Sequence, residues 1–455
     1  GHFDPEKINP VPIPDPDKGT VDLEYNLEEK ANDQIELSGG WGGGMFVGSL
    51  GLKFSNFSVR NFFNKEAWRP LPTGDGQTLS LRAQTNGKYY QSYSVSFVEP
   101  WLGGKKPNSL SVSIHRSIQT GLSSSYYNNP YNQMYGGYGG GYGGYGGGYG
   151  GAGMVTASDV NTDKYLKTLG LSVGFGRRLT WPDDYFTLYN ELSYTLYDLK
   201  DWRNFLMTDG VSHNLKARVM LSRSSIDNPL YTRSGSTFTV GVEATPPYSL
   251  FSNKDYSKIT DDKELYEFVE YHKWTFKSAM FKSLDTGNKL VVMTKLEAGF
   301  LGYYNEYLKS PFEKFNLGGD GMAGYSYYGS ETIGLRGYAN NSLTATAPVY
   351  DNKGNYLHSV SDGNIYTKMT MELRYPLTLQ PSATVYGLVF AEAGNSWSKF
   401  ENYNPFNLKR SAGVGVRIFL PMFGLMGIDW GYGFDDVVRP GDNGGNFHFV
   451  MGQNF

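Results

Sequence analysis

Apolar and polar residues alternate with a period of two in short segments along most of the chain. In LGLSVGF (169–175) every second residue is apolar, and KMTMELRY (368–375) shows the same alternation. A period of two indicates a β-strand with one apolar face and one polar face. The pattern therefore predicts an all-β protein whose strands separate two different surroundings.

Sixteen segments of this kind are predicted as strands. Their length of about 10 residues suits a strand that crosses a membrane at a tilt. The predicted strands are residues 34–42, 45–55, 77–86, 89–98, 109–119, 165–178, 185–198, 212–223, 235–245, 270–283, 289–301, 365–378, 382–394, 410–420, 424–434 and 446–455.

The connections between these strands alternate in length. Long connections follow strands 5, 7, 9, 11, 13 and 15, whereas most of the others are short, such as TWPDD (180–184) and SLDTGN (283–288). This alternation is typical of an outer-membrane barrel, which has loops on its external rim and turns on its periplasmic rim. An even number of strands then places both termini in the periplasm. The connection 56–76 is an exception, and NFFNKEAW (61–68) within it predicts a short helix.

Composition favours the same fold. The 455 residues include 58 Gly, 36 Tyr and 27 Phe against 19% charged residues, and the mean hydropathy is −0.43. A barrel has this composition because about half of its residues face a polar interior. The longest apolar run, 418–428, contains Pro421 and is shorter than the ~18 residues that a spanning helix needs. We therefore predict that residues 33–455 form a 16-stranded antiparallel transmembrane β-barrel with long extracellular loops.

The first 32 residues differ from the rest. INPVPIPDPDKGT (8–20) is rich in proline, and the alternating segment VDLEYNLEEK (21–30) follows it. This order predicts the tail of a preceding soluble domain that leads directly into strand one, although a simple extended arm is an alternative. The start GHFDPEKINP (1–10) lacks the apolar core of a signal peptide, so an exported protein is expected here in a mature or trimmed form.

Candidate chemistry is sparse. The net charge of −3 gives no sign of a nucleic-acid partner, and the chain has no cysteine for a disulfide or a thiol site. Ser172 lies in a G-x-S-x-G sequence, but it is in the middle of a predicted strand and not on the strand–turn–helix that a nucleophile elbow needs. The six histidines are scattered, and paired carboxylates such as Asp183 and Asp184 lie in turns. We expect neither enzymatic activity nor a metal or cofactor.

The low-complexity segment MYGGYGGGYGGYGGGYGG (134–151) lies in the predicted third external loop, residues 120–163. Repeated glycine prevents a fixed fold, while the tyrosines offer rings that stack on a partner or a glycan. A merely flexible, solvated loop is the alternative, and the residues alone do not decide between the two.

Five segments together resemble the Omp85 superfamily. LRGY (335–338) resembles the V/I-R-G-F/Y signature of its sixth external loop, which here spans residues 302–364. The other four occur in the family's order and spacing: FNLGGDG (315–321), VFAEAGNSW (389–397), DNPLYTRSGS (227–236) and SAGVGVRIFLPMFG (411–424). The resemblance implies that residues 1–32 are the end of the last POTRA domain.

In this family the sixth loop folds back into the barrel, and its arginine binds acidic residues of the inner wall. The residues implied here are Leu335, Arg336, Gly337, Tyr338, Glu372 and Glu392. The alternation places Glu372 on the polar face, whereas Glu392 shares its face with Tyr386 and Phe390, which leaves its direction open. A forked guanidinium suits paired carboxylates. A solvated surface arginine is the alternative.

The first and last strands form the other implied site. A barrel must pair these strands to remove its edges, and strand one, QIELSGGWGGG (34–44), is rich in glycine, which weakens a strand. We expect this seam to open and to pair with an incoming strand, although glycine that only permits a tight hairpin at 42–44 is an alternative. The last strand has an apolar face and ends on an aromatic residue, which resembles the targeting signal of outer-membrane barrels. The seam residues are Ile35, Leu37, Gly39, Gly40, Gly42, Gly43 and Gly44, with Phe447, Phe449, Met451, Gly452 and Phe455.

The resemblance implies the central subunit of a machine that folds and inserts barrel proteins in the outer membrane of a Gram-negative bacterium. Its expected partners are unfolded outer-membrane proteins, lipoprotein subunits on the periplasmic side and at the cell surface, and outer-membrane lipid and lipopolysaccharide. Two alternatives stay open. One is an Omp85 pore for two-partner secretion or TamA-like assembly, and the other is an ordinary porin or receptor.

Overall fold

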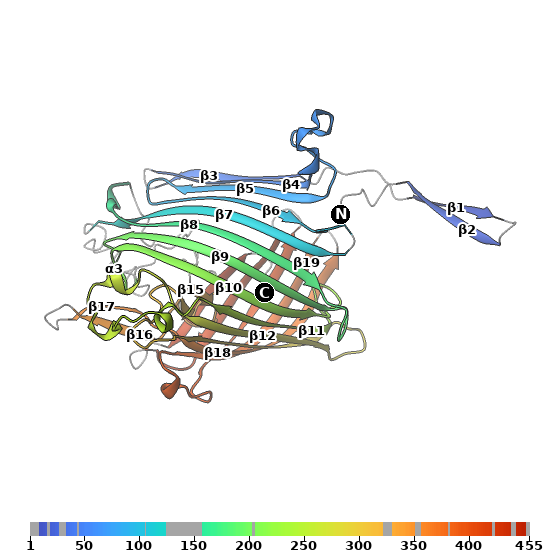
Figure 1. Cartoon of the computed structure of the whole chain (residues 1–455). Helices are drawn as coiled ribbons and strands as arrows, with labels where there is room; N and C mark the ends of the chain where they lie inside the picture. The colour runs from blue at the N-terminus through green and yellow to red at the C-terminus, as the bar shows by residue number, and fades with distance from the viewer. Residues whose placement is uncertain are drawn as a thin grey trace.

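The computed structural model describes residues 9–15, 19–26, 33–42, 45–104, 106–123, 157–202, 205–321, 330–350, 356–380, 383–420, 424–437 and 443–451. Within them one antiparallel sheet of 16 strands dominates, and its strands follow one another in chain order. The sheet curves round an interior that the long connections enter (Figure 1). The predicted all-β fold is confirmed, and each predicted segment overlaps one strand of this sheet.

The sheet consists of β3 (Gln34–Gly42), β4 (Met45–Phe57), β5 (Gln77–Asn86), β6 (Tyr90–Glu99), β7 (Asn108–Leu122), β8 (Val160–Arg178), β9 (Phe186–Lys200), β10 (Gly210–Ser224), β11 (Ser234–Ala244), β12 (His272–Ser283), β13 (Val291–Gly302), β18 (Ile365–Gln380), β19 (Ala383–Trp397), β20 (Lys409–Leu420), β21 (Gly424–Gly433) and β22 (Gly444–Met451). β3 and β22 are its two ends, and no pairing joins them among the described residues. Closure of the sheet therefore stays a prediction.

The distribution of side chains is the reverse of that in a water-soluble sheet. On β18, Met369 and Met371 are exposed, whereas the intervening Thr370 and Glu372 are buried. Exposed apolar side chains recur on the outer face of the other wall strands. Such an outer face suits contact with lipid, and the polar face turns inward. In the part of the chain that the structure describes, no helix is long and apolar enough to span a membrane.

Long connections carry secondary structure of their own. Between β13 and β18, β14 (Lys314–Leu317) pairs in parallel with β15 (Ser330–Ile333), and β16 (Thr346–Tyr350) forms a hairpin with β17 (Tyr356–Ser361). The connection from β11 to β12 contains η5 (Tyr248–Phe251), η6 (Tyr256–Lys258) and α3 (Asp262–Leu265). Two further connections contain the 3-10 turns η4 (Ala157–Asp159) and η7 (Phe400–Asn402).

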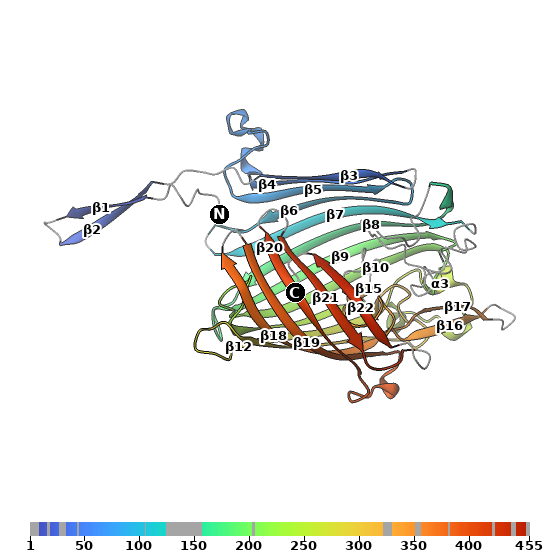
Figure 2. The same ribbon diagram turned by 180° about the vertical axis from the view of Figure 1, so that it is seen from behind.

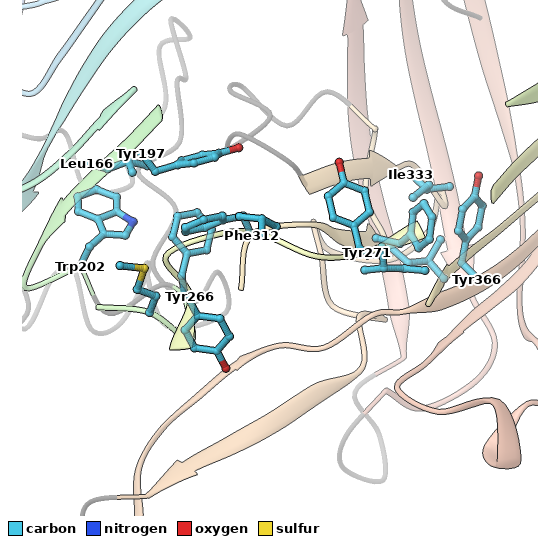
Figure 3. Packing of buried hydrophobic residues seen from close by; sticks show 14 of the residues in the cluster. Leu166, Tyr197, Trp202, Tyr266, Tyr271, Phe312, Ile333 and Tyr366 are labelled. Atoms are coloured by element: carbon cyan, nitrogen blue, oxygen red, sulfur yellow. The ribbon is translucent and has the colours of Figure 1, made fainter. Parts of the chain in front are cut away.

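The main hydrophobic cluster lies where these connections meet the wall (Figure 3). The ring of Phe312 stacks on Tyr197 of β9 with centroids 4.1 Å apart, and Phe315 of β14 lies 4.8 Å from Tyr366 of β18. These contacts hold the start of the long connection against two strands of the sheet, β9 and β18.

Two short elements lie outside the sheet. The segments predicted as extended arm and alternating strand pair with each other, as β1 (Asn9–Asp15) and β2 (Thr20–Asn26). This hairpin lies beyond one rim of the sheet, past the ends of the wall strands (Figure 2). The short helix predicted between β4 and β5 is present as two 3-10 turns, η2 (Arg60–Phe63) and η3 (Lys65–Ala67).

Candidate functional site

The connection between β13 and β18 carries the LRGY motif to the inner wall. Its path is set by the β14–β15 pair and by a bridge from Leu335 back to Gly319. Leu335 has no exposed surface and lies against Gly394 of β19, where a Cβ atom would be only 2.7 Å from Leu335 Cδ1. The missing side chain at Gly394 therefore makes room for Leu335, and the next residue is held inside the sheet.

Arg336 lies among three acidic side chains from three different strands. Its Nη2 donates to Glu372 Oε1 of β18 at 2.7 Å and to Glu392 Oε1 of β19 at 2.8 Å. Its Nη1 lies 3.4 Å from Asp429 Oδ2 of β21. Glu392 Oε2 also accepts the backbone N–H of Arg336 at 2.7 Å. The structure thus brings together the arginine and both glutamates named from the sequence, and it adds an aspartate.

A second set of cations pairs with the same carboxylates. Arg417 donates to both oxygens of Asp429 at 2.7 and 2.8 Å, Arg374 donates to Glu372 at 2.8 Å, and Lys368 Nζ lies 3.3 Å from Glu392. All of these side chains are buried. A buried charge is costly unless it is paired and hydrogen-bonded, so the alternation of charges is what makes this cluster tolerable.

The surroundings of Arg336 keep it charged. Its guanidinium lies 3.7 Å above the ring of Phe390. Burial opposes the charge, but attraction by Glu392, and then by Glu372 and Asp429, holds the pKa of Arg336 well above its ordinary value. Arg336 is therefore a permanent cation, and it joins the connection to the wall in a way that does not vary with physiological pH.

Gly337 extends the contact to the last strand of the sheet. Its φ of +89° favours glycine, and a Cβ atom there would lie 2.9 Å from Ser411 Cβ and from the backbone of Tyr432. The Gly337 N–H donates to His448 Nε2 at 2.8 Å, and Asn446 Nδ2 donates to the Gly337 carbonyl at 2.9 Å. The motif therefore contacts β22 directly, and His448 accepts through an unprotonated Nε2.

Tyr338 completes the docking at the end of β21. Its hydroxyl donates to the Arg410 carbonyl at 2.7 Å and accepts the N–H of Asp435 at 3.3 Å. The four motif residues together contact β18 to β22, so one connection holds five consecutive wall strands.

Sequence reasoning missed four members of this site: Arg417, Asp429, Asn446 and His448. A signal for two of them is present. Asp429 alternates with Ile428 and Trp430, and His448 alternates with Phe447 and Phe449, so both lie on the polar face of their strands. Among the described residues no group of three or more His, Cys, Asp or Glu side chains is arranged to hold a metal.

The seam residues named from the sequence lie at the two ends of the sheet. Ile35 is 75% exposed and Phe447 is 80% exposed, and Phe449 is also exposed. The backbones of Leu37, Gly39, Gly40 and Gly42 pair with β4, and the backbone of Met451 pairs with Met426 of β21. Gly43, Gly44, Gly452 and Phe455 lie outside the described residues, as does the Gly/Tyr-rich segment 134–151. Among the residues that the structure describes, no pairing joins the two groups.

Comparisons with known proteins agree with this architecture. A sequence model of the Omp85 superfamily domain matches residues 73–455. Among solved structures, BamA from Haemophilus ducreyi lacking POTRA domains 1–3 superposes with a TM-score of 0.60 at 16% identity, over 99% of this chain and 75% of that chain. CdiB from Acinetobacter baumannii gives a TM-score of 0.47 at 11% identity, over 98% of this chain and 65% of that one. No curated protein sequence matches the chain.

Proposed function

The chain belongs to the Omp85 superfamily of outer-membrane barrels, and we propose that it is the barrel subunit of a machine that folds and inserts outer-membrane proteins. The fold it shares with BamA is compatible with this role. The observation that carries the proposal is the position of β3 at one end of the sheet. Strand β3 pairs with β4 on one side, and among the described residues no strand pairs with its other side.

An unpaired strand edge presents a row of backbone N–H and C=O groups that pair with another strand. We propose that the terminal strand of an unfolded outer-membrane protein adds to β3 by these hydrogen bonds, as in other cases of β-augmentation. Each added hairpin has an apolar outer face that lipid accepts. The protein therefore needs no chemical step, nucleotide or catalytic residue for this work.

The Arg336 site supports this mechanism from the other side of the seam. It attaches the five strands from β18 through β22 to one interior connection. The wall that ends in β22 therefore moves as a unit. The glycines Gly39 and Gly40 weaken β3 on the opposite side. We propose that the seam opens between this stiff wall and the weak strand β3. We also propose that the short turns and both termini lie in the periplasm.

We propose the partners that the family resemblance implies. They are unfolded outer-membrane proteins at the seam, lipoprotein subunits on the periplasmic side and at the surface, and outer-membrane lipid and lipopolysaccharide around the apolar wall. The β1–β2 hairpin is proposed to be the end of a POTRA domain.

Photocrosslinking during client insertion tests the proposal. A benzophenone amino acid at Ile35, on the free edge, is expected to capture a client protein that is being inserted. The matched control is the same amino acid at Val389, which is similarly exposed but lies on β19 in the middle of the sheet. Equal capture from both positions would contradict β-augmentation at the seam. Passage of the client across the vesicle membrane without insertion would favour the alternative function, a pore for two-partner secretion.

A further inference from the structure

The connection between β4 and β5, residues 58–76, projects away from the outside of the sheet. Figures 1 and 2 both show it projecting from the wall at the rim on the side of the β1–β2 hairpin. It contains η2 and η3, and it leaves the sheet one strand away from the free end β3.

Polar contacts hold this connection in a fixed shape. Asn61 Nδ2 donates to the Thr73 carbonyl at 2.9 Å, and the Val59 N–H donates to Gln77 Oε1 at 2.8 Å. The buried hydroxyl of Ser58 donates to Asp75. These bonds stabilise the base of the connection, so the orientation of its tip is determined.

The tip presents apolar side chains to its surroundings. Phe63 is 94% exposed, and Phe62 and Trp68 are exposed as well. The ring of Phe62 lies 5.4 Å from that of Phe63 and 5.8 Å from that of Trp68, and Trp68 Nε1 donates to the Phe62 carbonyl at 3.3 Å. An ordered cluster that points apolar groups outward is expected to have an apolar environment, since water around them is unfavourable.

Other side chains on the same rim identify that environment. Because the strands are antiparallel, the turns β6–β7 and β8–β9 lie on the same rim as the connection β4–β5. Those turns expose Trp101, Trp181 and Tyr185. Trp and Tyr gather at membrane–water interfaces, and a barrel carries such a girdle at each rim. The tip therefore lies at the depth of the interface, outside the wall.

The charges of the connection complement phospholipid. Arg60, Lys65 and Arg69 are exposed beside the aromatic tip, and Glu66 is the exposed acid among them. Long basic side chains reach lipid phosphates while neighbouring apolar groups enter the acyl region. We propose that residues 58–76 form a membrane anchor whose tip inserts into the phospholipid leaflet at the turn-side rim. Through β4 this anchor holds the free end of the sheet at a fixed depth.

Fluorescence in vesicles tests this proposal, and the chain has no cysteine, so one introduced thiol is a unique label site. F63C labelled with an environment-sensitive nitrobenzoxadiazole is placed in vesicles of phosphatidylethanolamine and phosphatidylglycerol. We expect strong quenching by spin-labelled acyl chains and little quenching by aqueous iodide. The matched control is E66C, three residues along the same connection, for which the opposite quenching is expected.

Iodide quenching of the label at 63 that equals that at 66 would overturn the proposal. Protection of position 63 that appears only after soluble periplasmic proteins are added would also overturn it, because the tip would then be a protein-binding site. F62C, a second exposed position of the tip, must behave like F63C. The outcome is independent of client insertion, since no client protein is present.

Discussion

At the scale of single residues, Arg336 shows how a buried ion cluster is built from members that depend on one another. Each of its three acidic partners has one other cation: Arg417 for Asp429, Arg374 for Glu372 and Lys368 for Glu392. Replacement of Arg336 therefore leaves each carboxylate with one cation, but it removes the hydrogen bonds that the buried oxygens of Glu372 and Glu392 accept from Arg336.

We expect Arg336→Ala to lower the free energy of unfolding by about 3 kcal/mol, the low end for a broken buried ion pair because those other cations stay in place. The measurement is urea unfolding of the purified protein in detergent. Arg410→Ala is the control, because Arg410 pairs with Asp435 at an exposed position, and little change is expected there. Equal unfolding curves for the two variants would show that the cluster does not hold the protein together.

Gly337 gives a second residue-scale prediction, with a backbone cause. Gly337→Ala forces a Cβ atom against Ser411 and the backbone of Tyr432 at φ +89°. We expect a loss of about 1–3 kcal/mol in the same unfolding assay. Gly387→Ala is a matched control on β19, because a Cβ atom there meets nothing within 4 Å. A Gly337→Ala protein as stable as Gly387→Ala would mean that the motif accepts another backbone path.

Glu331 of β15 gives a prediction on pH. Burial opposes its charge, but Lys273 and then Lys277 hold the pKa of Glu331 below its ordinary value of 4.5. A carboxylate with a lowered pKa in the folded state adds stability that is present above the ordinary value and is lost as pH falls through the folded value. The stability difference between wild type and Glu331→Gln should therefore be constant near neutral pH and shrink below about pH 4.5. A difference that stays constant in acid would exclude this ion pair as its cause.

At the scale of elements, the wall strands were predictable because a period of two is a local signal. The long connection was not, since the parallel β14–β15 pair has four residues on each side and depends on contacts that are distant in sequence. The inward direction of Glu372 was predictable because this residue alternates with the apolar Met371 and Leu373. The direction of Glu392 stayed open because Phe390 and Tyr386 lie on the same face. The structure gives the reason: Phe390 lies beneath the Arg336 guanidinium, and Tyr386 packs edge-on against Tyr231, so aromatic rings also belong to the interior.

The weakness of β3 is testable at this scale. Gly40→Thr introduces a β-branched residue opposite Val47 and raises strand propensity by up to about 1 kcal/mol. We expect slower insertion of a client protein into vesicles, since a stronger β3–β4 pairing resists the movement that admits a new strand. Gly387→Thr makes the same change in an interior strand and should leave the rate unaltered. An insertion rate unchanged by Gly40→Thr would remove the glycines from the mechanism.

At the scale of the whole molecule, the charged interior and the apolar exterior have different roles. The interior cluster joins β18 to β22, while Ile35 and Phe447 expose apolar side chains at the two ends of the sheet. A free sheet edge invites uncontrolled pairing. We therefore propose that the two ends meet when no client is bound and separate when one is.

Covalent closure of the seam tests that requirement. Cysteine at Ile35 is combined with cysteine at Phe447 or at Phe449, and oxidation is expected to give a disulfide in at least one combination. The locked protein should lose client insertion, and reduction should restore it. The control pair is Leu296 with Met369, which face each other on β13 and β18 and are both exposed. Its oxidation should leave the insertion rate unchanged, because those strands stay paired throughout. A seam-locked protein that inserts clients at the wild-type rate would show that the path to the membrane does not run between β3 and β22.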